Sequence, residues 1–171
     1  MKFPRTLALM SLFSLLFGFA QAESLKVGEK APAVAGVIDD GSTLNLADVY
    51  KNHNYTVVWF YPKALTGGCT KQGCSLRDAS ADLKKHDVAV VGVSYDPIDL
   101  QKKFKETNNF PFPLVSDTDK KVGKAFGQGE GAVASREAYL IDRQGKIVYY
   151  DKGVTDKQAE NILNFLATKK G

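Results

Sequence analysis

The chain has 171 residues, of which 44% are hydrophobic and 25% are charged. This composition is typical of a soluble globular protein and excludes a disordered or a fibrous chain. The length suits one domain that is large enough to bury a core. The formal net charge of +4 is small and the lysines are scattered, which argues against a nucleic-acid-binding protein with a clustered basic face.

The two cysteines and two histidines limit the chemistry that the chain can carry. They are too few for a disulfide-rich scaffold or for a zinc site made of four cysteines. Neither His53 nor His86 shows a metal-binding spacing, and both are expected in exposed loops or at helix ends. His53 remains a candidate base for a cysteine.

Residues 1–22 have the pattern of a signal peptide. A short positively charged start precedes the uncharged apolar run 7–20, and Ala20 and Ala22 fit the positions that a signal peptidase reads. The run is shorter than the roughly 18 apolar residues of a membrane span. We therefore expect cleavage after Ala22 and no membrane attachment afterwards. A single domain over 23–171 would then work in the periplasm or outside the cell, where disulfides can form.

The elements that follow alternate between strands and helices. Residues 34–38 and 43–46, joined by an Asp-Asp-Gly-Ser turn, predict an N-terminal β-hairpin. The runs 55–61 and 88–95 are continuously apolar, which is typical of central strands covered by helices on both sides. Apolar residues at helical spacing within 76–83 predict a helix between these two strands.

The alternation continues after the second apolar run. Asp96 and Pro97 predict a helix start, with Asp96 as the N-cap and Pro97 in the first helical position. A strand within 109–115 and a short helix over 120–126 follow. Each of these elements is bounded by proline, glycine or another turn-forming residue.

The last part of the chain adds a hairpin and a helix. Residues 138–142 and 146–150 predict two strands joined by a tight Arg-Gln-Gly turn. Thr155 and Gln158 have the spacing of a capping box for the final helix. Strands separated by helices imply parallel pairs, and the closing hairpin adds antiparallel ones. We therefore predict an α/β fold with a central mixed sheet flanked by helices; the thioredoxin-like fold is one such arrangement.

The segment 62–74 lies where a predicted strand ends and a helix begins, the place where open α/β sheets form their sites. Cys69 falls near the helix N-terminus, whose N–H groups and dipole favour a thiolate. An ordinary thiol, with a pKa of about 8.5, is only about 3% thiolate at pH 7. Thr66 can offer its hydroxyl to the thiolate or to a bound oxygen. Gly67 and Gly68 let the backbone approach the same pocket.

Cys74 lies five residues after Cys69. In an ideal helix the two Cα atoms would be about 8.6 Å apart, beyond the roughly 7 Å that a disulfide allows. The cysteines can therefore bond only if the segment is never helical or if a helix unravels after oxidation. Gly73 is a poor helix former, and it lowers the cost of unravelling by up to about 1 kcal/mol relative to alanine.

These residues resemble the active site of the peroxiredoxins. Pro62-x-x-x-Thr66-x-x-Cys69 matches the pattern of that family. The Cys-x4-Cys spacing that ends at Cys74 is similar to the branch named after bacterioferritin comigratory protein, or peroxiredoxin Q. Arg136, just ahead of a predicted strand, resembles the arginine of the family.

The resemblance covers roughly residues 24–168 by the order of elements, and it includes Phe60-Tyr61-Pro62-Lys63 and the Arg77-Asp78 pair. One departure is visible. The branch commonly has proline where this chain has Gly67, which loosens the loop.

The resemblance implies a thioredoxin-like fold and a complete reaction cycle. Cys69 would attack hydrogen peroxide or an organic hydroperoxide, and its sulfenic acid would condense with Cys74 to a disulfide. A thioredoxin-like or other dithiol protein would reduce that disulfide. Arg136 would stabilise the thiolate and help hold the peroxide, Thr66 would hydrogen-bond the peroxide oxygen, and Pro62 would shield the sulfur from solvent. A monomer is implied, and no metal, flavin or haem is needed.

Two other functions stay open from the residues alone. A disulfide oxidoreductase of the thioredoxin fold would exchange with protein thiols, although the usual Cys-x-x-Cys spacing is absent. A periplasmic copper-binding module could use both thiolates, but it needs a further ligand such as a histidine. The glycines at 127, 129 and 131 do not predict a nucleotide loop, because a strand and not a helix follows them.

Overall fold

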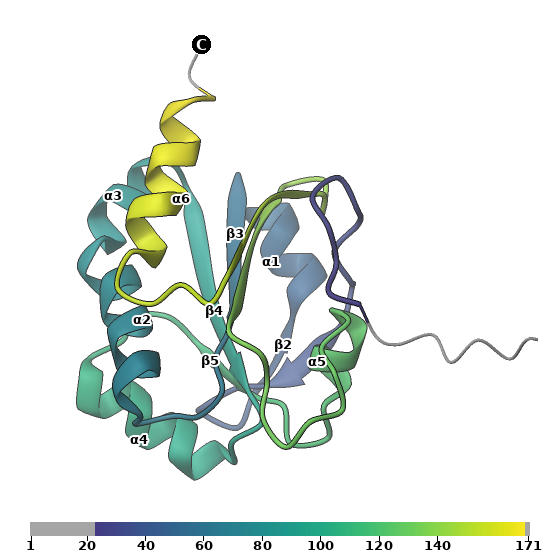
Figure 1. Ribbon diagram of the computed structural model, residues 1–171, viewed down its shortest axis with the longest axis vertical. Helices are drawn as coiled ribbons and strands as arrows, with labels where there is room; N and C mark the ends of the chain where they lie inside the picture. The colour runs from purple at the N-terminus through teal and green to yellow at the C-terminus, as the bar shows by residue number, and fades with distance from the viewer. Residues whose placement is uncertain (1–22, 170–171) are drawn as a thin grey trace, which may run out of the picture.

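A computed structural model describes residues 23–169 of the chain (Figure 1). The predicted signal peptide over 1–22 and the last two residues lie outside this range. No helix within 23–169 is long and apolar enough to cross a membrane. The elements are β1 (Ala35–Val37), β2 (Thr43–Asn45), α1 (Leu46–Asn52), β3 (Tyr55–Phe60), α2 (Gly67–Asp78), α3 (Ser80–Lys85), β4 (Val88–Ser94), α4 (Ile98–Asn108), β5 (Leu114–Ser116), α5 (Lys121–Ala125), β6 (Glu137–Asp142), β7 (Ile147–Lys152) and α6 (Gln158–Ala167).

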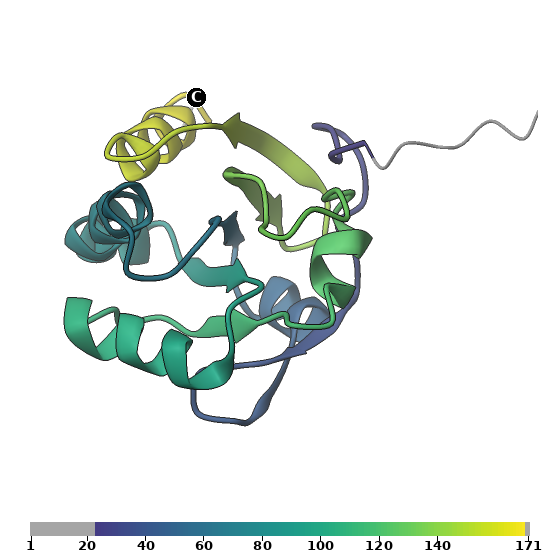
Figure 2. The same cartoon turned by 60° about the horizontal axis from the view of Figure 1, so that its bottom comes forward.

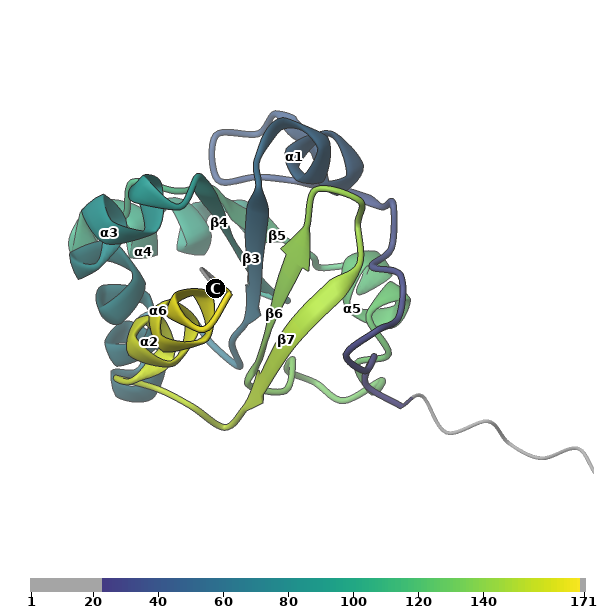
Figure 3. The same ribbon diagram turned by 90° about the horizontal axis from the view of Figure 1, so that it is seen from above.

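The central sheet has the strand order β5-β4-β3-β6-β7. β3 runs parallel to β4 and antiparallel to β6, while β1 and β2 form a separate antiparallel pair, as the predicted hairpin requires. Helices α2, α3, α4 and α6 lie on one side of the sheet, and α1 and α5 lie on the other (Figures 1 and 3). The predicted fold class, a mixed sheet flanked by helices, is therefore confirmed.

β3 lies at the centre of the sheet, and its side chains alternate between two apolar clusters. Val57 and Trp59 belong to the cluster beneath α2, α4 and α6, whereas Val58 and Phe60 belong to the cluster beneath α1 and α5. All four side chains are fully buried. Burial on both faces explains why this strand has no polar alternation, and it makes Trp59 a core residue, as expected.

Two helix boundaries differ from the prediction. Leu46, predicted as the last residue of the hairpin's second strand, instead begins α1. The Asn45 side chain caps this helix by accepting a hydrogen bond from the N–H of Ala47, in the first turn, at 3.0 Å. Leu46 and Tyr50, one turn apart, then bury the inner face of this helix. The single helix predicted over 76–83 is in fact the end of α2 and the start of α3, which meet at Ala79.

Two predicted helix caps are wrong. Pro97 is the N-cap of α4, and the Asp96 carboxylate instead accepts a hydrogen bond from the backbone N–H of Ala64, in the loop after β3. Lys157 is the N-cap of α6, the Thr155 hydroxyl donates to the neighbouring Asp156 carboxylate, and the Gln158 side chain is buried. In both helices a long-range contact uses the polar side chain that the local pattern assigned to a cap.

The strand predicted within 109–115 begins only at Leu114, the first residue of β5. Asn109 ends α4 in the left-handed conformation, with φ of 52°. The chain between α4 and β5 then places Phe110 and Phe112 in the cluster around Trp59. These two rings therefore serve the core beneath α2 and not a sheet edge.

Candidate active site

The register between β3 and β6 brings Cys69 and Arg136 together. Antiparallel pairing places Phe60, the last residue of β3, opposite Glu137, the first residue of β6. The loop that follows β3 and the residue that precedes β6 therefore lie at the same end of these two strands. Arg136 Nη2 donates to Cys69 Sγ at 3.4 Å, although the residues are 67 positions apart in sequence.

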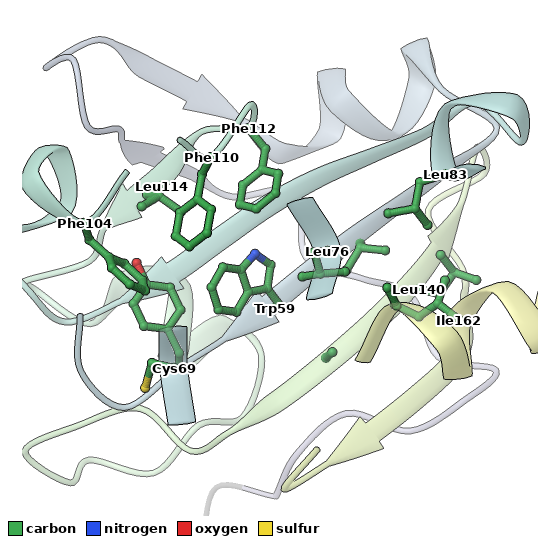
Figure 4. Close-up of a cluster of buried hydrophobic side chains, with 14 of the residues drawn as sticks. Trp59, Cys69, Leu76, Leu83, Phe104, Phe110, Phe112, Leu114, Leu140 and Ile162 are labelled. Carbon is green, nitrogen blue, oxygen red and sulfur yellow. The ribbon is translucent and has the colours of Figure 1, made fainter. Parts of the chain in front are cut away.

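Cys69 is the third residue of α2 and is fully buried. Figure 4 shows it at one end of the apolar cluster, with Phe104 nearby and Leu83 and Ile162 at the far end. The N–H groups of the first helical turn have no carbonyl partner inside the helix and point toward its N-terminus. Together with the guanidinium, they stabilise negative charge on the sulfur.

Gln72 holds Arg136 in place. The second nitrogen of the guanidinium, Nη1, donates to Gln72 Oε1 at 2.7 Å. Because Gln72 is one turn after Cys69, both lie on the same face of α2, and Arg136 bridges them. Sequence reasoning missed Gln72, although its spacing of three residues from the cysteine was an available signal.

The loop between β3 and α2 is fixed by short hydrogen bonds. The backbone N–H of Ala64 donates to Asp96 Oδ2 at 2.7 Å, and Leu65 follows in the left-handed region with φ of 62°. The Thr66 hydroxyl donates to the Lys63 carbonyl at 2.8 Å, so its hydrogen closes this turn and does not reach the sulfur. The half-buried Pro62 lies two residues after the end of β3.

A buried polar network supports this loop from below. Ser94 donates to the same Asp96 oxygen at 2.8 Å, and Gln101 Nε2 donates to Ser94 Oγ at 2.7 Å. The Tyr61 hydroxyl donates to Gln101 Oε1. Burial raises the pKa of Tyr61 far above its ordinary value, so this hydroxyl stays protonated and acts as a donor.

Cys74 is half-buried in the same helix, and its Sγ lies 4.0 Å from Asn108 Oδ1. Both cysteines are free thiols, and α2 is continuous from Gly67 to Asp78. Of the two alternatives left open by the sequence, the structure shows the helical one. A disulfide between Cys69 and Cys74 therefore requires α2 to unravel locally.

The two histidines lie at helix ends, as predicted, and away from the sulfur. His53 ends α1, and its Nδ1 lies 2.8 Å from Asp87 Oδ1. His53 precedes β3 and Cys69 follows it, so a strand of about 20 Å separates them; His53 is not the base of Cys69. Within residues 23–169 no group of three or more His, Cys, Asp or Glu side chains could hold a metal ion. The copper-binding alternative therefore lacks a ligand set there.

The chain is similar in sequence and in structure to known proteins. Residues 27–150 match the family described as AhpC/TSA. The peroxiredoxin Bcp of Escherichia coli (strain K12) is 38% identical over 151 residues, which cover 83% of this chain and 96% of the relative. The peroxiredoxin Bcp of Bacillus subtilis (strain 168) is 35% identical over 155 residues, which cover 86% of this chain and 96% of the relative. The crystal structure of peroxidoxin BcpB from Mycobacterium tuberculosis has a TM-score of 0.81 at 28% identity, covering 86% of this chain and 99% of that one.

Proposed function

Because this chain belongs to the AhpC/TSA family, in its Bcp and peroxiredoxin Q branch, it is a thiol-dependent peroxidase, and we propose that Cys69 attacks the peroxide. The observation that carries the assignment is the 3.4 Å contact between Arg136 Nη2 and Cys69 Sγ at the N-terminus of α2. We assign the resolving step to Cys74. The substrates are hydrogen peroxide and organic hydroperoxides.

In the first step the Cys69 thiolate attacks one peroxide oxygen, and the O–O bond breaks. The sulfur is oxidised to a sulfenic acid, and the leaving oxygen takes a proton from solvent and departs as water or an alcohol. Negative charge moves from the sulfur to the leaving oxygen during this step. Arg136, fixed by its 2.7 Å bond to Gln72, and the first-turn N–H groups of α2 stabilise that charge.

Thr66 and Pro62 serve the same step. The Thr66 hydroxyl turns from the Lys63 carbonyl, which it contacts at 2.8 Å, to the peroxide oxygen when substrate is bound. Pro62 is half-buried in the loop after β3 and limits the water that reaches the sulfur. Full burial of Cys69 in the resting enzyme favours small substrates over protein thiols, which distinguishes this function from that of a disulfide oxidoreductase.

In the second step the Cys74 thiol attacks the sulfenic sulfur of Cys69. The S–S bond forms, and the sulfenic oxygen leaves as water with the proton of the thiol. The helical spacing of about 8.6 Å means that α2 must open first. An external dithiol protein of the thioredoxin type then reduces the disulfide by thiol exchange and returns both cysteines to the free thiols of the resting state.

Rapid mixing of the reduced protein with hydrogen peroxide, followed by intact-mass measurement, tests these roles. We expect a sulfenic acid at Cys69 and then an intramolecular disulfide. Cys74→Ser should stop at the sulfenic acid, and Cys69→Ser should give no peroxide-dependent product. Full turnover in Cys69→Ser, or normal recycling of Cys74→Ser with a dithiol protein, would show that the corresponding assignment is wrong.

We also propose that the protein is exported and acts as a monomer. Export is supported by the positive start, the apolar run and the small residues Ala20 and Ala22 within residues 1–22. N-terminal sequencing of the protein from a periplasmic fraction should begin at Glu23, whereas an unprocessed protein in the cytoplasm would contradict export. Light scattering of the processed protein should give the mass of one chain.

A further inference from the structure

A row of buried amide groups joins the arginine of the active site to the last helix. Gln72 accepts a hydrogen bond from Arg136 and, through its Nε2, donates to Gln158 Oε1 at 3.0 Å. Gln158 Nε2 donates in turn to Asp151 Oδ2 at 2.9 Å. The two glutamines are 0% and 1% exposed, respectively, so every amide group in this row depends on its protein partner.

A second polar contact joins the same two helices. The Ser75 hydroxyl donates to the Gln72 carbonyl at 3.1 Å and accepts the backbone N–H of Ala159 at 3.3 Å. That N–H belongs to the first turn of α6, where no carbonyl of the helix can reach it. α2 and α6 lie side by side on the same side of the sheet (Figure 2). The first turn of α6 is therefore docked on α2 by two independent polar contacts.

Gln72 lies between Cys69 and Cys74, in the segment that must lose its helical conformation before the disulfide can form. When this segment opens, Gln72 leaves both Arg136 and Gln158. While Gln158 is in place, the buried amide of Gln72 is satisfied only in the folded helix, so the contact favours the folded form.

We propose that Gln158 is a positioning residue that sets the rate of the resolving step. It keeps α2 folded around the oxidised Cys69, and its contact with Gln72 must break before Cys74 can attack. This inference rests on the roles proposed above for Cys69 and Cys74. It also assigns a trade-off to Gln158: a tighter contact keeps Arg136 in place for peroxide attack but leaves the sulfenic acid longer in the site, where a second peroxide can oxidise it further.

Trp59 provides an optical signal for the opening of α2. Its ring is fully buried and makes an edge contact with Phe110, with centroids 6.5 Å apart. Phe110 lies so close to Gly73 that even a methyl group there would collide with the ring. Movement of Gly73 away from Phe110 during opening should therefore change the fluorescence of the tryptophan.

The test is rapid mixing of the reduced full protein with a range of hydrogen peroxide concentrations. A first phase proportional to peroxide reports the sulfenic acid, and a second phase independent of peroxide reports opening and disulfide formation; mass measurement on quenched samples assigns each. Gln158→Leu keeps the size of the side chain and removes both amide contacts. We expect its second phase to be about fivefold faster, the factor that one neutral hydrogen bond contributes. Its first phase should be slower by no more than about twofold, because the 2.7 Å bond from Arg136 to Gln72 remains.

Asn161→Leu is the matched control. Asn161 lies on the same helix and donates to the same Asp151 oxygen at 3.3 Å, but its amide belongs to no contact with Gln72. Both phases should stay unchanged in this variant. An equal acceleration in Asn161→Leu and Gln158→Leu would overturn the proposal, because it would reflect a general loosening of α6.

Ser75→Ala gives a second and independent measurement, because it removes the other polar contact between the helices. It should also speed the second phase, and it tests whether polar contacts between α2 and α6 keep α2 folded even if Gln158→Leu does not fold. An unchanged second phase in the folded variants would overturn the role of Gln158 alone. Absence of any peroxide-driven disulfide in the unmodified protein would instead overturn the roles of the two cysteines as well.

Discussion

Helices α2 and α6 pack against each other and against the same face of the sheet, but different interactions hold them. α6 buries an apolar stripe of Ala159, Ile162 and Leu166. The first two turns of α2 bury Cys69, Gln72 and Gly73 instead. Hydrophobic burial is non-directional and is lost only when a helix leaves the core, whereas polar contacts can break one at a time. The helix to which we assign the chemistry is therefore the one that can open locally.

The second half of α2 behaves like α6. Leu76 is fully buried in the cluster around Trp59, two residues after Cys74. This anchor lies beyond the segment that the proposed disulfide requires to unravel, so opening can stop there without disturbing α3. The contrast between a scaffold held by apolar contacts and an active segment held by polar ones suggests four experiments, and the largest effect is expected on the scaffold.

Ile162→Ala should lower the free energy of unfolding by about 2–5 kcal/mol, the range for truncating a buried isoleucine to alanine. Ile162 is 1% exposed and faces the sheet from α6. Urea denaturation of the reduced protein measures the loss. In the folded protein the peroxide-dependent phase should stay unchanged, since no polar group of the site is touched. A loss below about 1 kcal/mol would contradict the view that burial holds α6.

Arg136→Met should slow the peroxide-dependent phase by about 10- to 150-fold, because a hydrogen bond to a charged group contributes about 1.5–3 kcal/mol. The variant loses both the 3.4 Å contact with Cys69 and the 2.7 Å contact with Gln72. Rapid mixing with peroxide gives the rate constant. Arg136→Lys keeps the charge but loses the two-point geometry of the guanidinium, so its rate constant should lie between those of Arg136→Met and the unmodified protein. An unchanged rate in Arg136→Met would separate this residue from the chemistry.

Gly73→Ala should destabilise the docked form of α2 by about 1–3 kcal/mol of overpacking. The new methyl group would collide with the Phe110 ring, which is itself packed against Phe104 and Phe112. This cost exceeds the gain of up to about 1 kcal/mol in helix propensity. Denaturant unfolding measures the net change, and disulfide formation after peroxide should be faster. Gly67→Ala is the control, because it lies in the same helix and no atom is within 4 Å of the new carbon. Greater stability in Gly73→Ala than in the unmodified protein would contradict the prediction and would mean that the Phe110 ring moves aside.

The parts of the fold that the sequence predicted are those governed by local pattern. The apolar runs at 55–61 and 88–95 became the adjacent central strands β3 and β4, because burial on both faces leaves a continuous hydrophobic signal. The position of Cys69 at the start of a helix was also predictable, because its motif follows directly on the first of these apolar runs. Its partnership with Arg136 came only from family resemblance, since the contact depends on the register of β3 with β6.

The parts that escaped prediction depend on contacts between distant residues. Gln72 and Gln158 are 86 positions apart, and neither has an unusual neighbourhood in sequence. Gln158 even had a local explanation, the capping box with Thr155, that its burial against α2 overrides. The local pattern likewise predicts Asp96 as a helix cap, whereas its carboxylate accepts the N–H of Ala64 and so holds the loop before Cys69. Polar side chains offer several partners, and only the folded chain selects one.

Gly67→Pro makes the start of α2 more rigid and should raise the free energy of unfolding by about 0.4–1 kcal/mol, since proline restricts the unfolded chain. Gly67 is the first residue of the helix, where proline is favoured, and no atom lies within 4 Å of an added carbon. Thr66 already has the extended conformation, φ −89° and ψ 152°, that a following proline demands.

Gly68→Pro is the matched control, because its new carbon would lie 3.1 Å from Arg136 Nη2. A shift of the urea midpoint to higher concentration with unchanged peroxide reactivity is expected for Gly67→Pro, and slower peroxide reaction for Gly68→Pro. Equal effects of the two would show that stiffness at the start of α2, and not contact with Arg136, limits the reaction.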